Sequence, residues 1–553
     1  MDTLARLTRL ACVLLATSLP ALEAAGAASD IPHGWPAGIP SGPELEAAGA
    51  VIGRIQIRNA DIFDTSLPKE SGWLYRTANK LHINTRQSVI REQLLFAPGE
   101  RYVHRVVQET ERILRGNDYL YDAVIRPLAW DGRTVDLEVH TRDTWTLNPG
   151  VNYNRQGGEN SGSITLEEKN LLGTGQELSF GWSNDVDRES FDFEFVDPHV
   201  HSTWTSLGLR YSDADDGDTT ALRLDRPFYA NDTRRAGGLY LYDTSFVQPR
   251  YAEGERIGRF EHAQEFYEGY GGWSAGWKDG WVRRWTAGVT YDRERFAEIP
   301  DEPLGGPLPA DRKLVYPWIG FDLLQDAFQE RNNQDQIERT EDVLVGLRAG
   351  ARLGYAAEDL GSDRDAWILR AYVQDGFDIG EERSLFLGLN GSGRLESAGL
   401  RDAILSAEAR FYAKTGERWK FFATVAGTVT ERLDADKQLL LGGDTGLRGY
   451  PLRYQAGSSS ALLTLEQRYY TEWYPFRLFH VAGAMFFDAG RTWGRDVSGA
   501  TSDGLLKDVG IGLRLGSSRS AFGNVIHVDL AFPLDGEDDI DEVQFVVETK
   551  SRF

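Results

Sequence analysis

Leu441-Gly442-Gly443-Asp444-Thr445-Gly446-Leu447-Arg448-Gly449-Tyr450 opens the stretch that decides the fold, and Leu463-Thr464-Leu465-Glu466 and Phe486-Phe487-Asp488-Ala489-Gly490 complete it. The first segment sets one cation, Arg448, among glycines, which permit tight turns and close backbone packing. The other two alternate apolar with small or polar side chains, as strands with two unlike faces do. Glu466 and Asp488 fall on the polar faces. We therefore expect a loop arginine to meet two carboxylates on one interior wall, since its planar fork can hold a carboxylate by two hydrogen bonds.

These segments resemble the signature of the BamA/TamA-type superfamily of outer-membrane assembly and translocation barrels. The resemblance rests on Leu447-Arg448-Gly449-Tyr450, on Glu466 and on Phe487-Asp488-Ala489-Gly490. It implies that the Arg-Gly-Tyr tip belongs to a long loop folded back into a barrel, where the arginine pairs with acidic residues of the inner wall. The expected lock of this loop in the lumen consists of Arg448, Gly449, Tyr450, Glu466, Asp488 and Gly490.

Length and composition suit a large β-protein. The 553 residues leave room for one large barrel and an accessory domain, and 11% aromatic residues with 59 glycines favour strands and turns. Beyond the N-terminus no run of about 18 apolar residues occurs, which excludes a helical membrane protein but not a barrel, whose strands are apolar only at every second position. The formal net charge of −24 argues against nucleic acid as a partner.

The N-terminus is typical of export. Residues 1–28 are interpreted as a secretory signal peptide, with Arg6 and Arg9 before an apolar core and a small-x-small cleavage site at Ala25-Gly26-Ala27. The single cysteine, Cys12, lies within this segment, so the mature chain would have neither disulfides nor a reactive thiol. Residues 29–50, rich in Pro, Gly and Ala, predict a flexible leader.

Residues 51–142 predict a compact α/β unit. A strand at 51–57 precedes helices at 85–96 and 103–114, and strands at 122–127 and 134–139 flank an Asp131-Gly132 turn. Residues 67–84 are interpreted as an insertion. The order strand–helix–helix–strand–strand resembles a single POTRA domain, the periplasmic module that precedes such barrels. Two loop segments share the resemblance: Phe96-Ala97-Pro98-Gly99-Glu100 and Leu114-Arg115-Gly116-Asn117-Asp118-Tyr119. The alternative is a small α/β domain of another role. Ile55 and Ile57 mark the strand edge at which a client would add by β-augmentation.

From residue 143 to residue 553 the chain consists of alternating strands separated by turns, which predicts a transmembrane antiparallel β-barrel. Because hydrocarbon does not solvate an open sheet edge, the sheet must close. About 410 residues at roughly 25 per strand predict about 16 strands, the number that the family resemblance implies. A direct count of alternating segments approaches 20, and the excess is interpreted as hairpins within long loops, such as residues 261–285. The first and last strands would meet at a seam marked by Val151, Tyr153, Phe545, Val547 and Phe553.

The sequence contains no His-Glu-x-x-His and no phosphate-cradling glycine loop ahead of a helix. Its nine histidines do not cluster at metal-ligand spacing. Glu466 and Asp488 would make an acid/base pair, but an arginine between them keeps both ionised and favours a structural lock. We therefore predict no enzyme, no catalytic or metal-ligating residue and no cofactor.

The resemblance implies a protein of the bacterial outer membrane, in contact with its lipid and lipopolysaccharide, that inserts or translocates unfolded outer-membrane or secreted polypeptides. Its α/β domain would receive these clients in the periplasm. Two alternatives share the barrel: a passive channel or surface antigen, and a two-partner secretion translocator for one exported protein. Accessory lipoproteins or further copies of the chain are candidate partners. One POTRA unit, rather than several, puts a general assembly role in doubt.

Overall fold

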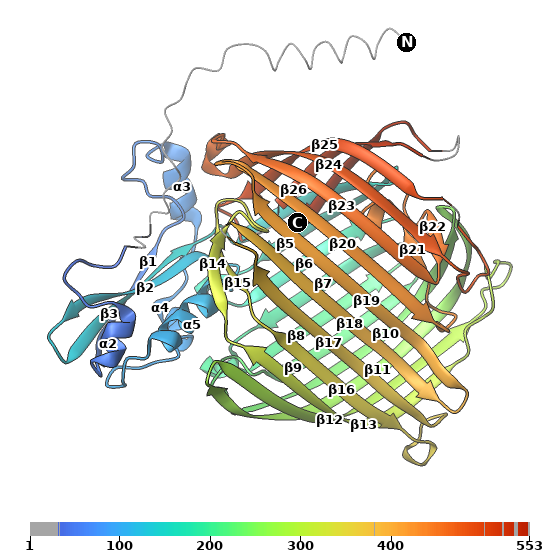
Figure 1. The fold of residues 1–553 in the computed structure, drawn as a ribbon, viewed down its shortest axis with the longest axis horizontal. Helices are drawn as coiled ribbons and strands as arrows, with labels where there is room; N and C mark the ends of the chain where they lie inside the picture. Colours follow the sequence, from blue (N-terminus) through green and yellow to red (C-terminus); the bar gives the residue numbers. More distant parts are fainter. Residues whose placement is uncertain are drawn as a thin grey trace, which may run out of the picture. The chain divides into compact units, whose positions relative to one another are not determined.

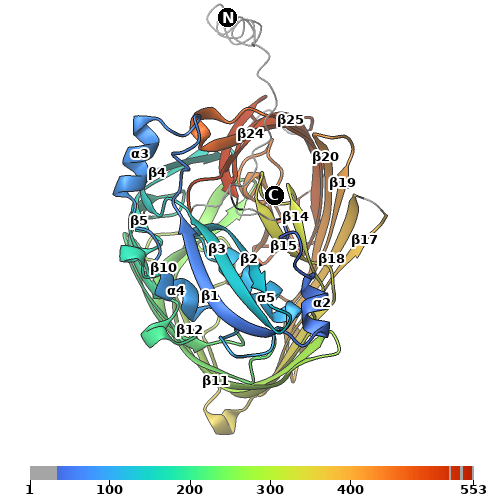
Figure 2. The same ribbon diagram turned by 90° about the vertical axis from the view of Figure 1, so that its left-hand side faces the viewer.

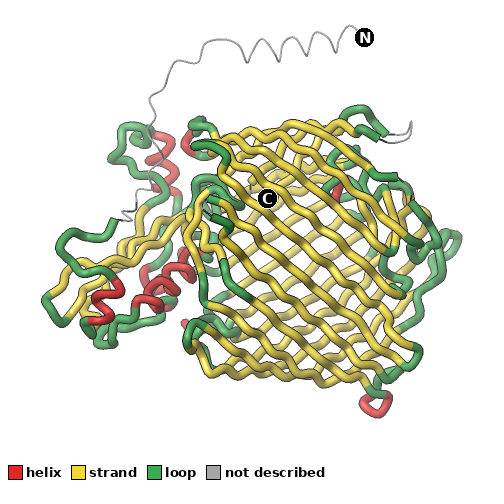
Figure 3. Tube along the Cα trace, in the orientation of Figure 1, coloured by secondary structure: helices red, strands yellow, loops and turns green. Residues whose placement is uncertain are grey.

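Twenty antiparallel strands form one closed barrel in a computed structural model (Figure 1; Figure 3). The structure describes residues 31, 34–380, 382–502, 504–521, 525–535 and 540–550, with the backbone alone for residues 151–153. The expected signal peptide and Phe553 lie outside the described residues. The barrel strands are β4 (Leu147–Gln156), β5 (Glu159–Glu168), β6 (Glu177–Asn184), β7 (Glu189–Asp197), β8 (Ser206–Ala214), β9 (Gly217–Arg226), β10 (Arg235–Ala252), β11 (Glu255–Lys278), β12 (Trp281–Ala297), β13 (Arg312–Gln325), β16 (Arg348–Ala356), β17 (Ala366–Asp378), β18 (Arg383–Glu396), β19 (Gly399–Lys414), β20 (Trp419–Glu431), β23 (Ser459–Tyr470), β24 (Phe479–Trp493), β25 (Leu506–Ser517), β26 (Val525–Pro533) and β27 (Gln544–Lys550).

The expectation of about 16 strands was wrong. Residues 261–285, interpreted as a hairpin within a long loop, belong to β11 and β12, which pair along most of their length in the wall. Many connections are as short as the two residues between β4 and β5 or between β10 and β11, so fewer residues per strand are needed than the estimate allowed. The even number of strands places the start of β4 and the end of β27 at the same end of the barrel, here called the proximal end; the opposite end is called distal.

Period-2 alternation gives the wall two chemically different faces. On β24, Phe486 and Asp488 are buried on the inner face, whereas Met485 between β23 and β25 is 54% exposed on the outer face. Trp273, Trp285, Ile319 and Val425 are likewise more than half exposed. An apolar outer face around a polar interior is the arrangement that a barrel in hydrocarbon requires.

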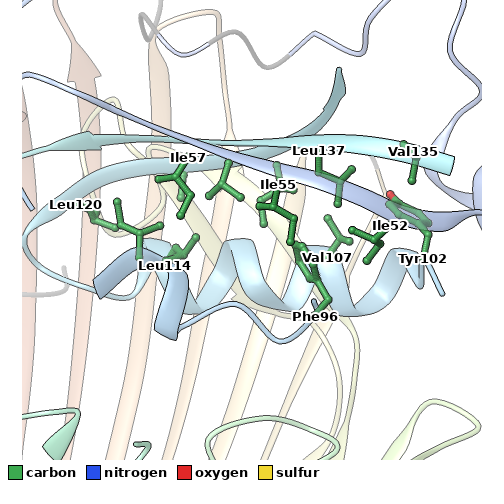
Figure 4. Close-up of a cluster of buried hydrophobic side chains, with 14 of the residues drawn as sticks. Ile52, Ile55, Ile57, Phe96, Tyr102, Val107, Leu114, Leu120, Val135 and Leu137 are labelled. Carbon is green, nitrogen blue, oxygen red and sulfur yellow. The ribbon is translucent and has the colours of Figure 1, made fainter. Parts of the chain in front are cut away.

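The N-terminal α/β unit consists of a three-stranded sheet covered by helices. β1 (Val51–Ala60) runs parallel to β3 (Thr134–Asp143), and β2 (Leu120–Trp130) runs antiparallel to β3 on its other side. Its buried core joins the sheet to the helices (Figure 4). The helices of this core are α4 (Gln87–Glu92) and α5 (His104–Arg115), preceded by α2 (Gly42–Ala47). A further helix, α3 (Trp73–Leu81), lies between β1 and α4 and has no buried residue.

Three local features of this unit differ from the expectations. The segment expected to be a flexible leader contains α2, whose Leu45 joins the core with no exposed surface, because Glu44 caps the helix by accepting a hydrogen bond from the N–H of Ser41 at 2.8 Å. The insertion at 67–84 contains α3. The helix expected through residue 96 ends at Glu92, and the N–H of Leu95 donates to Oγ1 of Thr110 at 3.4 Å instead of continuing the helix.

Two connecting segments carry small sheets of their own. The distal connection between β20 and β23 contains β21 (Leu439–Leu441) and β22 (Gln455–Gly457), and the proximal connection between β13 and β16 contains β14 (Phe328–Asn332) and β15 (Thr340–Leu344). Figure 2 looks along the barrel and places β14 and β15 inside the ring of strands. Single 3₁₀ turns lie at η1 (Leu171–Gly173), η2 (Val200–Ser202), η3 (Glu358–Leu360), η4 (Gly443–Thr445) and η5 (Pro475–Arg477).

Candidate functional site: the ion-pair cluster of the lumen

The Arg448 tip is held by a compact turn of the distal loop. The N–H of Leu447 donates to the carbonyl of Gly442 at 3.0 Å, and Gly446 adopts φ +117°, a conformation that favours glycine. Leu447 and Tyr450 have no exposed surface and form an apolar cluster with Leu441 and Leu506. The hydroxyl of Tyr450 also lies 2.7 Å from the carbonyl oxygens of both Lys507 and Asp535. Apolar burial and hydrogen bonds thus fix the backbone on both sides of Arg448.

Arg448 binds the inner wall through three carboxylates. Its Nε and Nη2 donate to the two oxygens of Asp488 at 2.7 and 3.1 Å, which is the bidentate geometry. Its Nη1 donates to Glu466 at 3.1 Å and to Asp529 at 3.2 Å. The guanidinium carbon lies 3.4 Å from the ring centroid of Phe486, within cation–π range. The structure therefore brings Arg448, Glu466 and Asp488 together.

Two further arginines complete the cluster. Arg514 donates to Glu466 at 2.8 Å and to Asp529 at 2.5 Å, and Arg468 donates to Glu466 at 2.8 Å. Three guanidinium groups and three carboxylates therefore form one network, and each of these six residues is at most 5% exposed. Buried charges at this density are tolerated only when each is paired and hydrogen-bonded, as they are here.

Gly449 and Gly490 permit the close approach of loop and wall. The N–H of Gly449 donates to Asp508 at 3.1 Å, and a Cβ at Gly449 would lie 2.7 Å from Cβ of Asp508. At Gly490 a Cβ would lie 3.1 Å from the side chain of Leu441 in the loop. Both glycines thus lie where the loop backbone meets the strands, in the cluster to which the sequence assigned them.

The sequence reasoning missed Asp529, Arg514 and Arg468. The signal for Asp529 was the alternation of β26, where Val525, His527, Asp529 and Ala531 are buried on one face. Arg468 lies two residues after Glu466 and shares its face by the same parity. Because all carboxylates of the network are held by guanidinium groups, the arrangement suits holding a loop rather than transferring protons.

The proximal connection enters the lumen from the other end and reaches the same cluster. Ile337 is buried against Tyr470, Ala482 and Val525 of the wall. The backbone carbonyl of Gln334 accepts a hydrogen bond from Nη1 of Arg468 at 3.4 Å, and Arg468 also binds Glu466. We call residues 326–347 the proximal plug, because they lie across the lumen between the α/β unit and the Arg448 cluster.

Helix α5 of the α/β unit binds the proximal plug through two arginines. Arg115 donates to both oxygens of Asp342 at 2.8 and 2.7 Å and to Glu330 at 2.9 Å. Arg112 donates to Asp326 at 3.3 Å and stacks on the ring of Phe328 at 4.3 Å. The plug is therefore in contact with the α/β unit on one side and with the lumen network on the other.

The expected seam and client edge are resolved in part. β27 and β4 are neighbours in the closed barrel, and Val547 pairs with Arg155, while Phe545 is 42% exposed on the outer face. The side chains of Val151 and Tyr153, like the whole of Phe553, lie outside the described residues. In the α/β unit, Ile55 and Ile57 are 7% and 6% exposed and face the core, so these two side chains are not presented at the edge of the sheet.

Across the described part of the chain, no group of three or more His, Cys, Asp or Glu side chains is placed to hold a metal ion. Within the same residues, no helix has both the length and the apolar character needed to cross a membrane.

Residues 393–551 match the Omp85 superfamily domain. No curated protein matches the chain. Among solved structures the chain is similar to BamA from Haemophilus ducreyi lacking POTRA domains 1–3, at 13% identity over 90% of this chain and 84% of that chain, with a TM-score of 0.36. It is also similar to CdiB from Escherichia coli, at 12% identity over 90% and 76% of the two chains, with a TM-score of 0.45, and to CdiB from Acinetobacter baumannii, at 12% over 90% and 73%, with a TM-score of 0.41. The Omp85 match spans Arg448, Glu466 and Asp488 together.

Proposed function

We propose that this BamA/TamA-type Omp85 barrel of the bacterial outer membrane inserts or translocates polypeptides, which reach it through its α/β unit on the periplasmic side. The observation that carries the proposal is the ladder between the first and last strands. In the described residues, β27 and β4 share a single residue pair, Val547↔Arg155. The neighbouring ladders have seven pairs between β26 and β27 and ten between β4 and β5.

A short ladder makes this seam the least costly place to open the wall. Each backbone hydrogen bond contributes on the order of 1 kcal/mol net, so opening a one-pair ladder costs several kcal/mol less than opening its neighbours. The freed edges of β4 and β27 would each present unpaired backbone N–H and C=O groups, which a client strand can pair with irrespective of its sequence.

The α/β unit would supply clients by the same chemistry. In the described part of the chain, β1 forms one edge of the three-stranded sheet, with Gln56 and Arg58 exposed beside the buried Ile55 and Ile57. An extended polypeptide could add to this edge through its main chain.

The proximal plug would couple the two ends of the path. A client that displaces α5 or competes for Arg115 would release Asp342 and Glu330 of the plug. The plug also accepts a hydrogen bond from Arg468, which belongs to the lumen network. Release of the plug would therefore break one hydrogen bond of that network.

A passive channel is the second candidate, and one observation favours it. A cavity of about 750 Å³ lies inside the wall formed by β11 to β19, lined among others by Trp318, Arg352 and Arg370. The distal loop and the proximal plug occupy the lumen beside it, which favours a gated barrel over a steadily open one. A two-partner secretion translocator would share the seam, the edge and the plug, and it would differ in having one dedicated client.

In-cell photo-crosslinking tests the proposal. Probes replace Val547 at the seam and Gln56 at the exposed face of β1, with Ile319 on β13 as the matched control, since it is 59% exposed on the opposite wall. We expect nascent polypeptides to be captured at positions 547 and 56 but not at 319. Many different outer-membrane clients would indicate general assembly, and one secreted protein would indicate a dedicated translocator. Capture of lipid or of the chain itself alone, at normal abundance, would refute polypeptide handling and favour the channel.

A cysteine pair at Val547 and Arg155 gives an independent test. Oxidation should close the seam covalently and stop client release, while the pair Thr428/Ser460 within the ladder of β20 and β23 should have no effect. Unchanged client processing in the oxidised 547–155 variant would mean that the seam does not open.

A further inference from the structure

Helix α3 lies outside the ring of strands at the proximal rim. Figure 2 places α3 beside β4 on the outer side of the barrel, and in Figures 1 and 2 the helix runs across the barrel axis. One side of α3 is fixed to the protein. The ring of Tyr75 packs at a tilt against Phe63, with centroids 4.8 Å apart, and Nδ2 of Asn79 donates to the carbonyl of Phe63 at 2.7 Å. Nε2 of His82 lies 2.9 Å from Asp143. A helix that lies across the barrel axis is parallel to the plane of the membrane.

The other side of α3 is apolar and exposed. Trp73 is 73% exposed, Leu74 50% and Leu81 68%. At about 100° per residue, these three side chains fall within an arc of roughly 100° that also contains the exposed Thr77. Arg76 and Lys80, both exposed, occupy the neighbouring arc away from the protein. The helix thus has three stripes: one against the protein, one apolar and one basic.

The rim next to α3 also exposes apolar side chains. The hydroxyl of Tyr75 donates to the carbonyl of Phe476 at 3.4 Å, so the turn between β23 and β24 contacts the helix. In this turn Phe476 is 74% exposed and Trp473 is 63% exposed. The turn connects directly to β24, whose outer face carries the exposed Met485 of the lipid-facing wall. The turn with Trp473 and Phe476 therefore lies beside α3, on the side of Tyr75, and leads into a strand of the lipid-facing wall.

We propose that α3 and the turn at residues 471–478 form a lipid-binding surface that lies in the periplasmic leaflet, with Trp73, Leu74, Leu81, Trp473 and Phe476 among the acyl chains and Arg76 and Lys80 at the phosphates. Tryptophan is suited to this depth because its ring is apolar and its N–H is polar. Lysine and arginine reach the phosphates of anionic phospholipids while their stems remain in the apolar layer. The occupant is phospholipid rather than a client polypeptide, because the patch is flanked by cations and joins the surface that already faces lipid.

The surface would anchor the α/β unit beside the seam. Arg519, in the connection between β25 and β26, donates to the carbonyl of Ile62 at 2.7 Å and to Glu70 at 2.7 Å, both in the segment that leads to α3. The inference does not rest on polypeptide handling, since a barrel of any function with this rim would present the same face to lipid.

Depth-dependent fluorescence quenching tests the proposal on the full mature chain reconstituted into vesicles of phosphatidylethanolamine and phosphatidylglycerol. Trp73→Cys and Phe476→Cys carry an environment-sensitive fluorophore, with Ile319→Cys on the lipid-facing wall as the positive control and Asp131→Cys in the exposed turn between β2 and β3 as the negative control. We expect a nitroxide on the phospholipid near the head group to quench the fluorophores at 73, 476 and 319 at least twofold, and the fluorophore at 131 by less than a fifth.

Quenching at 73 and 476 as weak as at 131, in a barrel that still shows the heat-dependent gel shift of the folded form, would overturn the proposal. Protection of position 73 only after an unfolded polypeptide is added would also overturn it and would assign the face to protein. A second variant, Arg76→Gln with Lys80→Gln, keeps the apolar stripe; we expect its quenching at 73 to become independent of the phosphatidylglycerol fraction, and an unchanged dependence would remove the role of these two cations.

Discussion

Removing the guanidinium of Arg448 tests the lumen network most directly. Arg448→Met keeps a long side chain against Phe486 but deletes four hydrogen bonds to three buried carboxylates. Two of the carboxylates keep other partners, because Glu466 still binds Arg468 and Arg514, and Asp529 still binds Arg514. Among the described residues, Asp488 loses its only guanidinium. The loss should therefore be concentrated at Asp488, and breaking one buried ion pair costs about 3–5 kcal/mol.

Because the loss of stability should fall mainly on Asp488, a second substitution at this residue gives a specific test. Asp488→Asn in the Arg448→Met background should recover most of the loss, to within about 1–2 kcal/mol of the wild type, because a neutral amide removes the unpaired charge. Glu466→Gln in the same background should recover nothing, since it takes the charged partner from Arg468 and Arg514. The free energy of unfolding is measured by urea titration of the barrel in vesicles, with the folded fraction read from the gel shift of unheated samples. A loss below about 1 kcal/mol, or rescue by Glu466→Gln instead of Asp488→Asn, would refute this account of the network.

Three further predictions concern the α/β unit, the plug and the loop. Arg115→Glu should repel Asp342 and release the proximal plug, which would be measured as faster proteolysis of residues 326–347 and higher ion conductance. Asp342→Arg in the same chain should restore the contact. If it does not, Arg115 and Asp342 do not act as a direct pair. Burial raises the pKa of Glu111 from 4.5 to about 7, so the protonated carboxyl is favoured in the folded unit. Its contribution to the free energy of unfolding is at most about 3 kcal/mol. This contribution is complete below pH 4.5 and is lost as the pH rises through 7. Hydrogen exchange of β2, corrected for intrinsic rate, should show protection falling from pH 5 to pH 8 in the wild type and not in Glu111→Gln, and an equal fall in both would exclude Glu111 as the cause. Gly449→Ala should cost about 1–3 kcal/mol in the urea titration because its Cβ would overlap Asp508, whereas Gly483→Ala, with nothing within 4 Å of the new Cβ, should change stability by less than about 0.5 kcal/mol; equal effects would contradict the tight packing of the loop.

The sequence predicted the barrel, the α/β unit and the pairing of Arg448 with two acidic strands, because these depend on period-2 alternation and on short motifs. It failed where the outcome depends on length or on tertiary contact. The number of strands depends on the lengths of the turns. In β11, which has 24 residues, the sequence does not show where a membrane-spanning part would end and a loop begin. The proximal plug was missed because residues 326–342 are mostly polar, as a solvated loop would be, and only the assembled wall shows that Ile337 is buried.

The helix α3 illustrates a different limit. Its apolar stripe was present in the sequence, but Trp73, Leu74 and Leu81 alternate with Arg76 and Lys80 over a segment that reads as an insertion between two elements. Periodicity alone does not say whether such a stripe packs on protein or faces lipid. The exposed fraction of each side chain in the structure shows that this stripe does not pack on the protein.

The ladder between β27 and β4, with one pair among the described residues, also bears on how the barrel assembles. Every other neighbour in the ring is also the next barrel strand along the chain, so those ladders can form one hairpin at a time. The contact of β27 with β4 alone joins the two ends of the barrel sequence, and contacts of such large sequence separation form slowly because the chain must first lose the entropy of closing the loop. Within the part of the chain that the structure describes, this contact also forms the fewest backbone pairs of the ring. Ring closure should therefore be the last and most reversible step of folding, and a destabilised chain should populate a curved open sheet, with β4 and β27 as its two edges, before any other part of the wall is lost.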